Sequence, residues 1–140
     1  MKINSATSAQ IAASDASLST WLTANAGSGK TKVLIDRVAR LLLDGVQPEQ
    51  ILCLTYTKSA AVEMKNRLFD RLGKWAMLAD RDLNLSLFET GIQRKLSIAE
   101  LKKARTLFAR AIEAPGGLKI QTIHAFCASL LRKFPLEAGI

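Results

Sequence analysis

The chain has 140 residues, of which 49% are hydrophobic and 23% are charged, and this composition excludes a disordered or low-complexity chain. Twenty Lys and Arg residues against twelve Asp and Glu give a net charge of +8, which favours a polyanionic partner such as nucleic acid. No apolar run is long enough to span a bilayer, and the N-terminus lacks the apolar core of a secretory signal. We therefore expect a cytoplasmic protein without a membrane partner, in which Cys53 and Cys127 are reduced and buried.

The first third of the chain predicts a short helix, a strand and a longer helix. Residues 7–15 can form the short helix, and the apolar run "LSTWLTA" (18–24) is the strand candidate. From residue 29 to about residue 43, apolar side chains recur at helical spacing, and Asp44-Gly45 ends the run.

The rest of the chain continues the alternation of strands and helices. "ILCLTY" (51–56) is typical of a strand buried on both faces, and a helix is expected over 59–75. Residues 76–118 differ in texture and predict a mostly helical insert, which is followed by a strand over 118–123 and a helix over 124–134. This order predicts an α/β fold with a mostly parallel sheet flanked by helices.

Within the insert, the clearest helix signal covers residues 97–114. Ser97 with Glu100 three residues later predicts a capping box that opens this helix, and Pro115-Gly116-Gly117 closes it. Three basic residues of the insert are expected to lie on a solvated face: Lys102, Lys103 and Arg105.

The stretch "ANAGSGKT" (24–31) carries the strongest chemical signal. A phosphate-binding loop needs converging backbone N–H groups at the start of a helix, and glycine allows this close approach. A predicted strand precedes the loop and a predicted helix follows it, which disfavours an incidental turn with a surface lysine. The candidate nucleotide-binding residues of the loop are Ala24, Asn25, Ala26, Gly27, Ser28, Gly29, Lys30 and Thr31.

Each polar residue at the end of the loop has an expected role. Lys30 can place its ammonium near the β- and γ-phosphates, and Thr31 can offer its hydroxyl to a nucleotide-bound Mg²⁺. Ala24 stands where the strict pattern has glycine. The neighbouring charges Lys32 and Arg37 are expected to be solvated helix residues.

The loop with alanine at its first position resembles motif I of superfamily 1 DNA helicases of the UvrD/RecB type. Gln10, twenty residues before Lys30, is similar to the Q motif of that family. "ILCLTYTKSAAVEMKNRL" (51–68) resembles motif Ia, and "IQTIHAFCASLLRKF" (120–134) resembles the segment that follows it. Within the family the similarity is greatest to helicase-nuclease proteins of the AddA type, in their alphaproteobacterial form.

The resemblance implies an ATP site and a single-stranded DNA site in one chain. It implies that ATP and Mg²⁺ are the cofactors, that Gln10 reads the adenine edge, and that Gly27, Gly29, Lys30 and Thr31 hold the phosphates. It further implies movement in the 3′→5′ direction during double-strand break repair, together with an AddB-like partner.

The expected DNA contacts follow the two later strands. The residues alone favour this placement, because hydroxyls, an aromatic ring and a lysine at the C-terminal end of a strand suit phosphates and stacked bases. The resemblance implies that Tyr56 stacks on a base and that Thr57 and the segment after residue 120 contact the DNA backbone. The candidates are Thr55, Tyr56, Thr57, Lys58, Thr122 and His124.

Alternatives stay open at three of these positions. Many relatives carry Phe-Thr-Asn-Lys where this chain has Tyr56-Thr57-Lys58-Ser59, so stacking is retained but the role of Lys58 is open. Tyr56 can also cap the edge of a core. His124 can be either a DNA contact or a structural residue, and no metal-ligand pattern accompanies it.

The residues needed for ATP hydrolysis are incomplete in these 140 residues. A motor needs a magnesium-holding acidic pair after an apolar strand and an arginine against the developing charge. Asp80 and Asp82 do not follow such a strand, and no nuclease constellation is present. We expect residues 1–140 to form the first part of a RecA-like lobe that stops before the Walker B motif, without turnover on its own.

Two other function classes compete with the helicase interpretation. The first is a non-catalytic fragment that binds a nucleotide or nucleic acid, which fits the missing acidic pair. The second is a small-molecule P-loop kinase, which leaves the segments at 51–68 and 120–134 unexplained.

Overall fold

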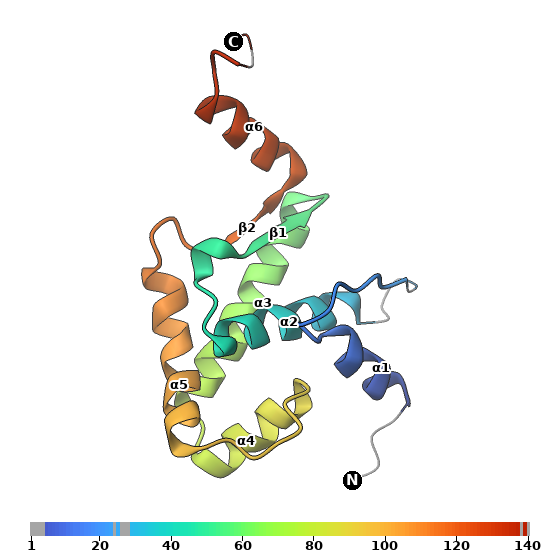
Figure 1. The fold of residues 1–140 in the computed structure, drawn as a ribbon, viewed down its shortest axis with the longest axis vertical. Coiled ribbons are helices and arrows are strands. Elements are labelled where there is room, and N and C mark those ends of the chain that lie inside the picture. Colours follow the sequence, from blue (N-terminus) through green and yellow to red (C-terminus); the bar gives the residue numbers. More distant parts are fainter. Residues whose placement is uncertain (1–4, 24, 26–28, 138, 140) are drawn as a thin grey trace.

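A computed structural model describes residues 5–23, 25, 29–137 and 139 (Figure 1). The described residues form an α/β arrangement in which helices outnumber strands. The elements are α1 (Ser5–Ala13), α2 (Lys30–Asp44), a 3₁₀ turn (Pro48–Gln50), β1 (Leu52–Thr55), α3 (Lys58–Met77), α4 (Asp80–Glu89), α5 (Ile98–Glu113), β2 (Lys119–Thr122) and α6 (Ile123–Lys133).

The sheet consists of β1 and β2 within the described residues. The two strands run parallel, and their register pairs Leu52 with Lys119 and Thr55 with Thr122. Because parallel strands need a crossover, the chain returns to the sheet through α3, α4 and α5. The predicted parallel pairing of the segments at 51–56 and 118–123 is confirmed.

The strand predicted over 18–24 is wrong for residues 18–23, which have no regular structure. A strand needs a neighbour to pair with its backbone groups, and neither β1 nor β2 pairs with this segment. The Arg37 guanidinium instead takes backbone carbonyls at Asp15 and Leu18. The Trp21 side chain is exposed and donates its ring N–H to the Thr23 hydroxyl at 3.0 Å.

Burial on both faces of β1 is also wrong. Cys53 faces the core and is buried, whereas Leu52 and Leu54 are 42% and 41% exposed. The pattern alternates because successive side chains of a strand point to opposite faces, and the core lies on the face that Cys53 shares. An uninterrupted apolar run therefore does not establish two covered faces.

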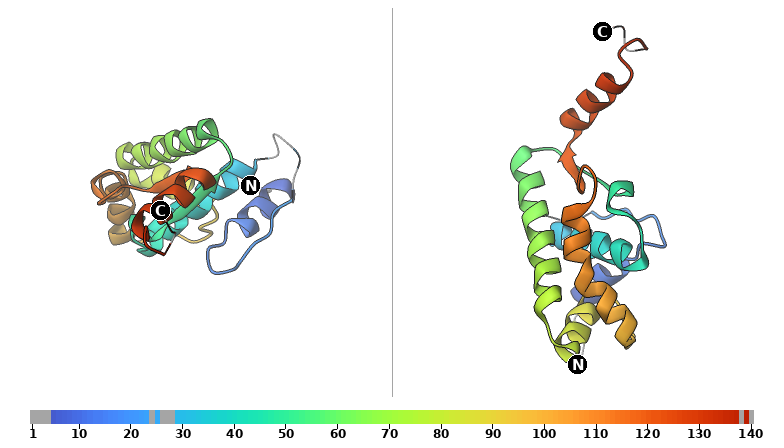
Figure 2. Two further views of the ribbon diagram at one scale, coloured as in Figure 1. Left: turned by 90° about the horizontal axis from the view of Figure 1, so that it is seen from above. Right: turned by 90° about the vertical axis from the view of Figure 1, so that its left-hand side faces the viewer.

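The core lies where α3 crosses α2 and α5. Met64, Leu68, Leu72 and Trp75 form one buried stripe along α3, as the helical spacing predicts. The Trp75 indole N–H donates to the Ser86 hydroxyl of α4 at 2.8 Å, which satisfies its polar atom inside the core. Figure 2 shows α3 as the long helix that runs beside α5 and below the sheet.

The predicted helix ends are confirmed at several positions. Gly45 adopts the left-handed conformation (φ 100°) and its N–H bonds back to the last turn of α2. Ser97 and Glu100 form the expected capping box of α5. The insert is helical, although α3 continues to Met77 and so crosses the predicted boundary at residue 76.

Arg105 in the insert is not a solvated residue. Its guanidinium donates to the Leu78 carbonyl at 2.8 Å and to the Asp80 carboxylate at 2.6 Å, so it ties α5 to the start of α4. Lys102 is exposed, as expected, and Lys103 is half-buried.

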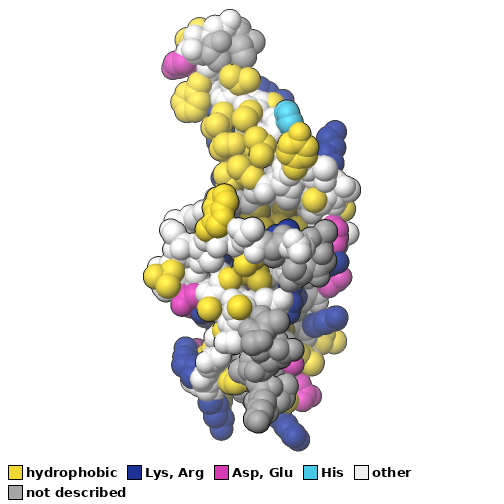
Figure 3. All heavy atoms as spheres, turned by 90° about the vertical axis from the view of Figure 1, so that its right-hand side faces the viewer, with side chains coloured by type: hydrophobic (Ala, Val, Ile, Leu, Met, Phe, Trp, Pro, Cys, Tyr) yellow, Lys and Arg dark blue, Asp and Glu magenta, His cyan; other side chains and the backbone are white. Residues whose placement is uncertain are grey.

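The last helix, α6, extends away from the rest of the described chain (Figures 1 and 2). None of its residues is buried, and Cys127 is therefore exposed rather than buried. Both cysteines are free thiols, and burial raises the pKa of Cys53 to about 11. Figure 3 shows hydrophobic side chains gathered over the end of the molecule that α6 forms; the exposed ones there include Ile123, Leu130, Leu131, Phe134 and Leu136.

Candidate nucleotide and nucleic-acid site

The glycine-rich loop leads directly into the first turn of α2. Gly29 adopts a left-handed conformation (φ 88°, ψ 16°), and its carbonyl accepts the Val33 N–H at 3.0 Å. No side chain among the described residues caps this N-terminus, whereas Thr57, Ser97 and Thr122 cap α3, α5 and α6. The first turn of α2 thus presents backbone N–H groups of the kind that bind anions.

Two of the loop's functional candidates lie at the surface of this turn. Lys30 and Thr31 are both exposed, and the Lys30 ammonium donates to the Asn25 carbonyl at 3.4 Å. The predicted residues Ala24, Ala26, Gly27 and Ser28 lie outside the described residues. A hollow of about 500 Å³ adjoins Lys30 and is lined by Ala13, Ser19, Thr20, Leu22, Val33, Leu34 and Arg37.

Gln10 lies against the start of α2, although it is far from the loop in sequence. A Cβ atom added to Gly29 would stand 2.8 Å from the Gln10 side-chain nitrogen. The close approach therefore needs glycine at position 29, both for space and for its positive φ. The structure brings together Gln10, Gly29 and Lys30 from two separate motifs.

The predicted nucleic-acid residues meet at one edge of the sheet. Thr55 pairs with Thr122 in the parallel register, so the segments that follow both strands leave the sheet side by side. Tyr56 is 82% exposed and Lys58 is exposed at the start of α3. His124 is exposed in the first turn of α6.

Three threonines at this edge have structural hydrogen bonds of their own. Thr57 and Thr122 accept the backbone N–H groups of Ala60 and Ala125 as helix caps, at 3.2 and 3.1 Å. The Thr55 hydroxyl donates to the Thr57 carbonyl at 2.9 Å. Thr122 is also buried, so of this group Tyr56, Lys58 and His124 are the side chains open to a ligand.

A buried ion-pair cluster supports the first turns of α2 from behind. Asp36 is buried and pairs with Lys32 at 2.8 Å and with Arg71 of α3. Burial, followed by the charge of Arg71, lowers the pKa of Lys32, and burial lowers the pKa of Arg71. Lys32 and Arg37 are therefore not simply solvated charges: the first holds Asp36, and the second holds the chain after α1.

The sequence pattern did not lead to Asp36 and Arg71, although one signal was available for the first of them. Asp36 stands three residues after Val33 and three before Ala39, on the apolar stripe of α2. A carboxylate in that stripe must find a cation, because an unpaired buried charge is costly. The identity of the cation could not be read from the pattern, since Arg71 belongs to another helix.

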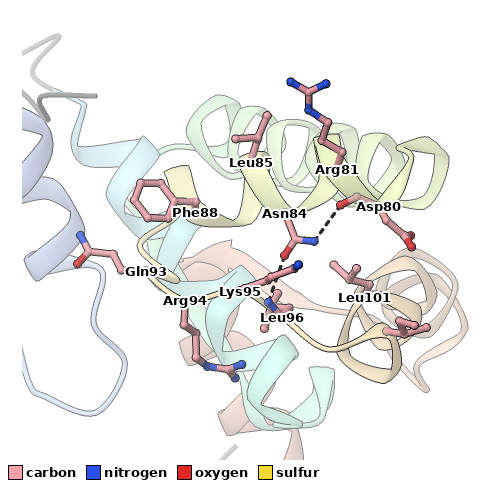
Figure 4. A pocket seen from close by; sticks show the side chains of 11 residues that line it. Asp80, Arg81, Asn84, Leu85, Phe88, Gln93, Arg94, Lys95, Leu96 and Leu101 are labelled. Carbon is pink, nitrogen blue, oxygen red and sulfur yellow. Dashed lines mark hydrogen bonds between the residues drawn. The ribbon is translucent and has the colours of Figure 1, made fainter.

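The largest hollow of the described residues lies elsewhere, inside the insert (Figure 4). It measures about 700 Å³ and has an apolar floor that includes Leu85, Phe88 and Leu101. Asn84 crosses it by donating to the Asp80 carbonyl at 2.9 Å and accepting the Leu96 N–H at 3.2 Å. No residue of the glycine loop lines it, so its size does not make it the nucleotide site.

Metal-ligand clusters and membrane-spanning helices are both missing from the described part of the chain. No group of three or more His, Cys, Asp or Glu side chains is arranged to hold a metal ion there. None of the helices in these described ranges has the length and apolar character needed to cross a membrane.

Comparisons with known proteins match the motifs to one family. The family model described as "UvrD/REP helicase N-terminal domain" matches residues 5–140. The ATP-dependent helicase/nuclease of Lactobacillus acidophilus is similar through its A subunit, which is 34% identical over 113 residues, covering 81% of this chain and 8% of the relative. The proteins of the same name from Enterococcus faecalis (32% identical; 81% of this chain, 7% of the relative) and Exiguobacterium sibiricum (34% identical; 85% and 8%) are also similar.

The coverage is one-sided, because the chain spans 7 to 8% of the length of these relatives. No solved structure matches the chain. The family match covers nearly all of the sequence and contains the glycine loop, both strands and the residues that follow them. The chain therefore belongs to the UvrD/REP helicase N-terminal domain family, and its relatives include ATP-dependent helicase/nuclease proteins of the AddA type.

Proposed function

We propose that this chain is the ATP-binding and single-stranded-DNA-contacting part of an ATP-dependent DNA helicase motor. In this proposal residues 1–140 form part of the first RecA-like lobe, and residues 76–118 are its helical insert. The observation that carries the proposal is the meeting of Gln10, Gly29 and Lys30 at the uncapped N-terminus of α2.

The residues at this site fit a nucleoside triphosphate. Gly29 lets the backbone approach where a Cβ would collide with Gln10, and the first turn of α2 directs N–H groups outward. Gln10 can pair with an adenine edge, because its amide carries both a donor and an acceptor. Lys30 is placed to neutralise phosphate charge, and Thr31 offers a hydroxyl for Mg²⁺, which would add charge stabilisation when bound.

The edge of the sheet supplies the nucleic-acid part of the proposal. Tyr56 presents an exposed ring for base stacking, while Lys58 and His124 flank it from the starts of α3 and α6. Thr57 and Thr122 contribute by capping these helices, which fixes the backbone around the ring. The net charge of +8 favours phosphate binding across this surface.

The finer identity of the whole protein follows from its relatives. We infer an AddA-type helicase-nuclease that moves 3′→5′ with an AddB-like partner, in cytoplasmic double-strand break repair. Hydrolysis needs an acidic pair and an arginine that the 140 residues do not contain in suitable positions. We therefore expect this chain to bind ATP without turning it over.

The test is the binding of a fluorescent ATP analogue to the chain, with and without Mg²⁺, beside Lys30→Ala. We expect saturable binding that Lys30→Ala weakens by at least about tenfold, because a charge-assisted contact to phosphate is lost. Lys95→Ala removes an equivalent charge from the insert and is the matched control. Fluorescence anisotropy gives the dissociation constants, and circular dichroism confirms that each variant is folded.

Two results would count against the nucleotide site. Binding that Lys30→Ala and Lys95→Ala weaken equally would mean that the analogue responds only to overall charge. Absence of binding by a folded chain would favour the non-catalytic, nucleic-acid-binding alternative, which a single-stranded DNA titration then examines directly.

A further inference from the structure

The turn between α4 and α5 packs against the end of α1. Ser14, the residue after α1, is fully buried, and its hydroxyl donates to the Ile11 carbonyl at 2.8 Å. The Thr90 carbonyl of the insert lies 3.5 Å from the same hydroxyl. Thr90 is itself buried, and its hydroxyl donates to the Leu87 carbonyl at 2.7 Å. A segment of the insert is thus part of the support of α1.

Arg40 of α2 joins the same cluster from the other side. One guanidinium nitrogen donates to the Ser14 hydroxyl at 3.0 Å and to the Ile11 carbonyl at 3.3 Å. The other lies 3.7 Å from the Asp15 carboxylate. The Arg40 side chain therefore grips the C-terminal end of α1, where helix carbonyls carry partial negative charge.

Gly91 completes the contact between the insert and this arginine. It has a φ of 101°, and a Cβ atom built on it would stand 2.9 Å from an Arg40 nitrogen and 3.0 Å from an Ile11 methyl carbon. The turn can approach this closely because position 91 has no side chain. Three segments that are distant in sequence therefore meet at Arg40: α1, α2 and the α4–α5 turn.

This cluster controls where Gln10 lies. Gln10 precedes Ile11 in α1, and its carbonyl accepts the Ser14 N–H at 3.0 Å. An isolated helix of nine residues is marginal in water, so α1 depends on these tertiary contacts for its place. The side chain of Gln10 reaches Gly29 from this position.

We propose that Arg40 and the Thr90–Gly91 turn of the insert position Gln10 for recognition of the nucleotide base. The insert then acts as a scaffold for base selectivity rather than as a spacer, and Arg40 acts through Gln10 without touching the nucleotide. This inference rests on the proposed nucleotide site, because it gives that site its selectivity for adenine over a bare phosphate chain.

The experiment measures two competitors of the fluorescent ATP analogue on the intact chain: ATP and inorganic tripolyphosphate. We expect wild type to bind ATP more tightly than tripolyphosphate. Arg40→Ala and Gln10→Ala should each weaken ATP by about tenfold, because one of them removes the base contact and the other its support. Tripolyphosphate affinity should stay within about twofold of wild type, since Lys30 and the first turn of α2 are unchanged.

Three further variants separate positioning from loss of structure. The double variant Gln10→Ala/Arg40→Ala should bind ATP no more weakly than either single variant, because both act on one interaction. Arg40→Lys keeps the charge but loses the fork, and should recover part of the ATP affinity. Arg110→Ala, which removes an α5 guanidinium that is bonded to Gln47, should leave both competitors unchanged.

Hydrogen exchange of α1 provides a readout that needs no nucleotide. In Arg40→Ala the α1 amides should lose protection while those of α3 keep it, and Arg110→Ala should change neither. Unchanged α1 protection overturns the inference even if wild type binds no nucleotide, which is the result that overturns the proposed function. Equal loss of ATP and tripolyphosphate in Arg40→Ala, or additive losses in the double variant, also overturns the inference.

Discussion

At the scale of single residues, side chains that look alike in the sequence have different surroundings. Lys30 and Lys32 are neighbours on α2, yet Lys30 is exposed beside the glycine loop and Lys32 is held by buried Asp36. Arg37 and Arg40 both bind backbone carbonyls around the end of α1. Charge alone therefore does not separate a ligand contact from a structural contact in this chain.

Tyr56 is the residue at which the nucleic-acid proposal can be tested most directly. Tyr56→Ala should weaken single-stranded DNA binding by about tenfold, because a base loses its stacking partner. Tyr56→Phe keeps the ring and should bind within about twofold of wild type. Electrophoretic or anisotropy titration with a short oligonucleotide at fixed salt measures both.

The exposure of Tyr56 makes this variant informative. Its side chain is 82% exposed, so truncation leaves no cavity and should not alter stability. Equal DNA affinity for wild type and Tyr56→Ala would mean that the ring is exposed without being used.

At the scale of elements, local signals predicted helix ends better than they predicted strands. The Ser97 and Glu100 pair and the Asp44-Gly45 ending act within one turn of backbone, so the sequence contains the whole cause. The segment at 18–23 has an apolar pattern but no paired neighbour among the described strands, and a strand depends on that neighbour. Arg105 was unpredictable for the same reason, because its partners Leu78 and Asp80 come from a different part of the chain.

The candidate site divides along the same line. The glycine loop and the helix after it were predictable, because phosphate binding needs a short contiguous pattern. The nearness of Gln10 to Gly29 was expected only from the family resemblance, and the support of α1 by Arg40 was not expected at all. Contacts between distant segments do not leave a periodic pattern in the sequence.

The start of α5 gives a prediction about pH. The Arg94 guanidinium, followed by the Ser97 N–H and hydroxyl, lowers the pKa of Glu100 from 4.5 to about 2. A lowered pKa in the folded state stabilises the protein above the ordinary value, and this stabilisation is lost as pH falls from about 4.5 towards 2. Glu100→Gln should therefore lower Tm at about pH 7, and the difference from wild type should shrink towards about pH 3.

Thermal unfolding followed by circular dichroism at several pH values measures this difference. Glu113→Gln, at the exposed C-terminal end of the same helix, is the matched control for loss of one acidic side chain. The effect should be modest, because the Arg94–Glu100 pair is exposed and solvent weakens it. A difference in Tm that stays constant across the range would contradict the assigned hydrogen bonds.

At the scale of the whole molecule, the described chain has a packed body and a projecting end. The body is centred on α3, with Leu68, Leu72 and Trp75 fully buried against the other helices. The projecting end is α6, which touches the two strands and buries none of its residues. Most apolar side chains of the body are paired with one another, whereas those of α6 face solvent (Figure 3).

This contrast predicts uneven hydrogen exchange. Amides of α6 should exchange at least about 100-fold faster than those in the middle of α3, because few buried contacts oppose local opening of α6. Mass spectrometry of exchanged peptides covering 58–77 and 123–133 measures the ratio. Equal protection of the two helices would mean that α6 is covered in solution, and dilution of the sample would then show whether a second copy covers it.

The parallel pairing of β1 with β2 has a consequence for the order in which the chain folds. The two strands are separated by α3, α4 and α5, so their ladder closes a long loop and gains hydrogen bonds only after that entropy is lost. Contacts between α3 and α5 bring the strand ends together beforehand, because the same two helices bracket the insert. The surface that carries Tyr56 and His124 is therefore assembled last, after the helical body that supports the glycine loop has already formed.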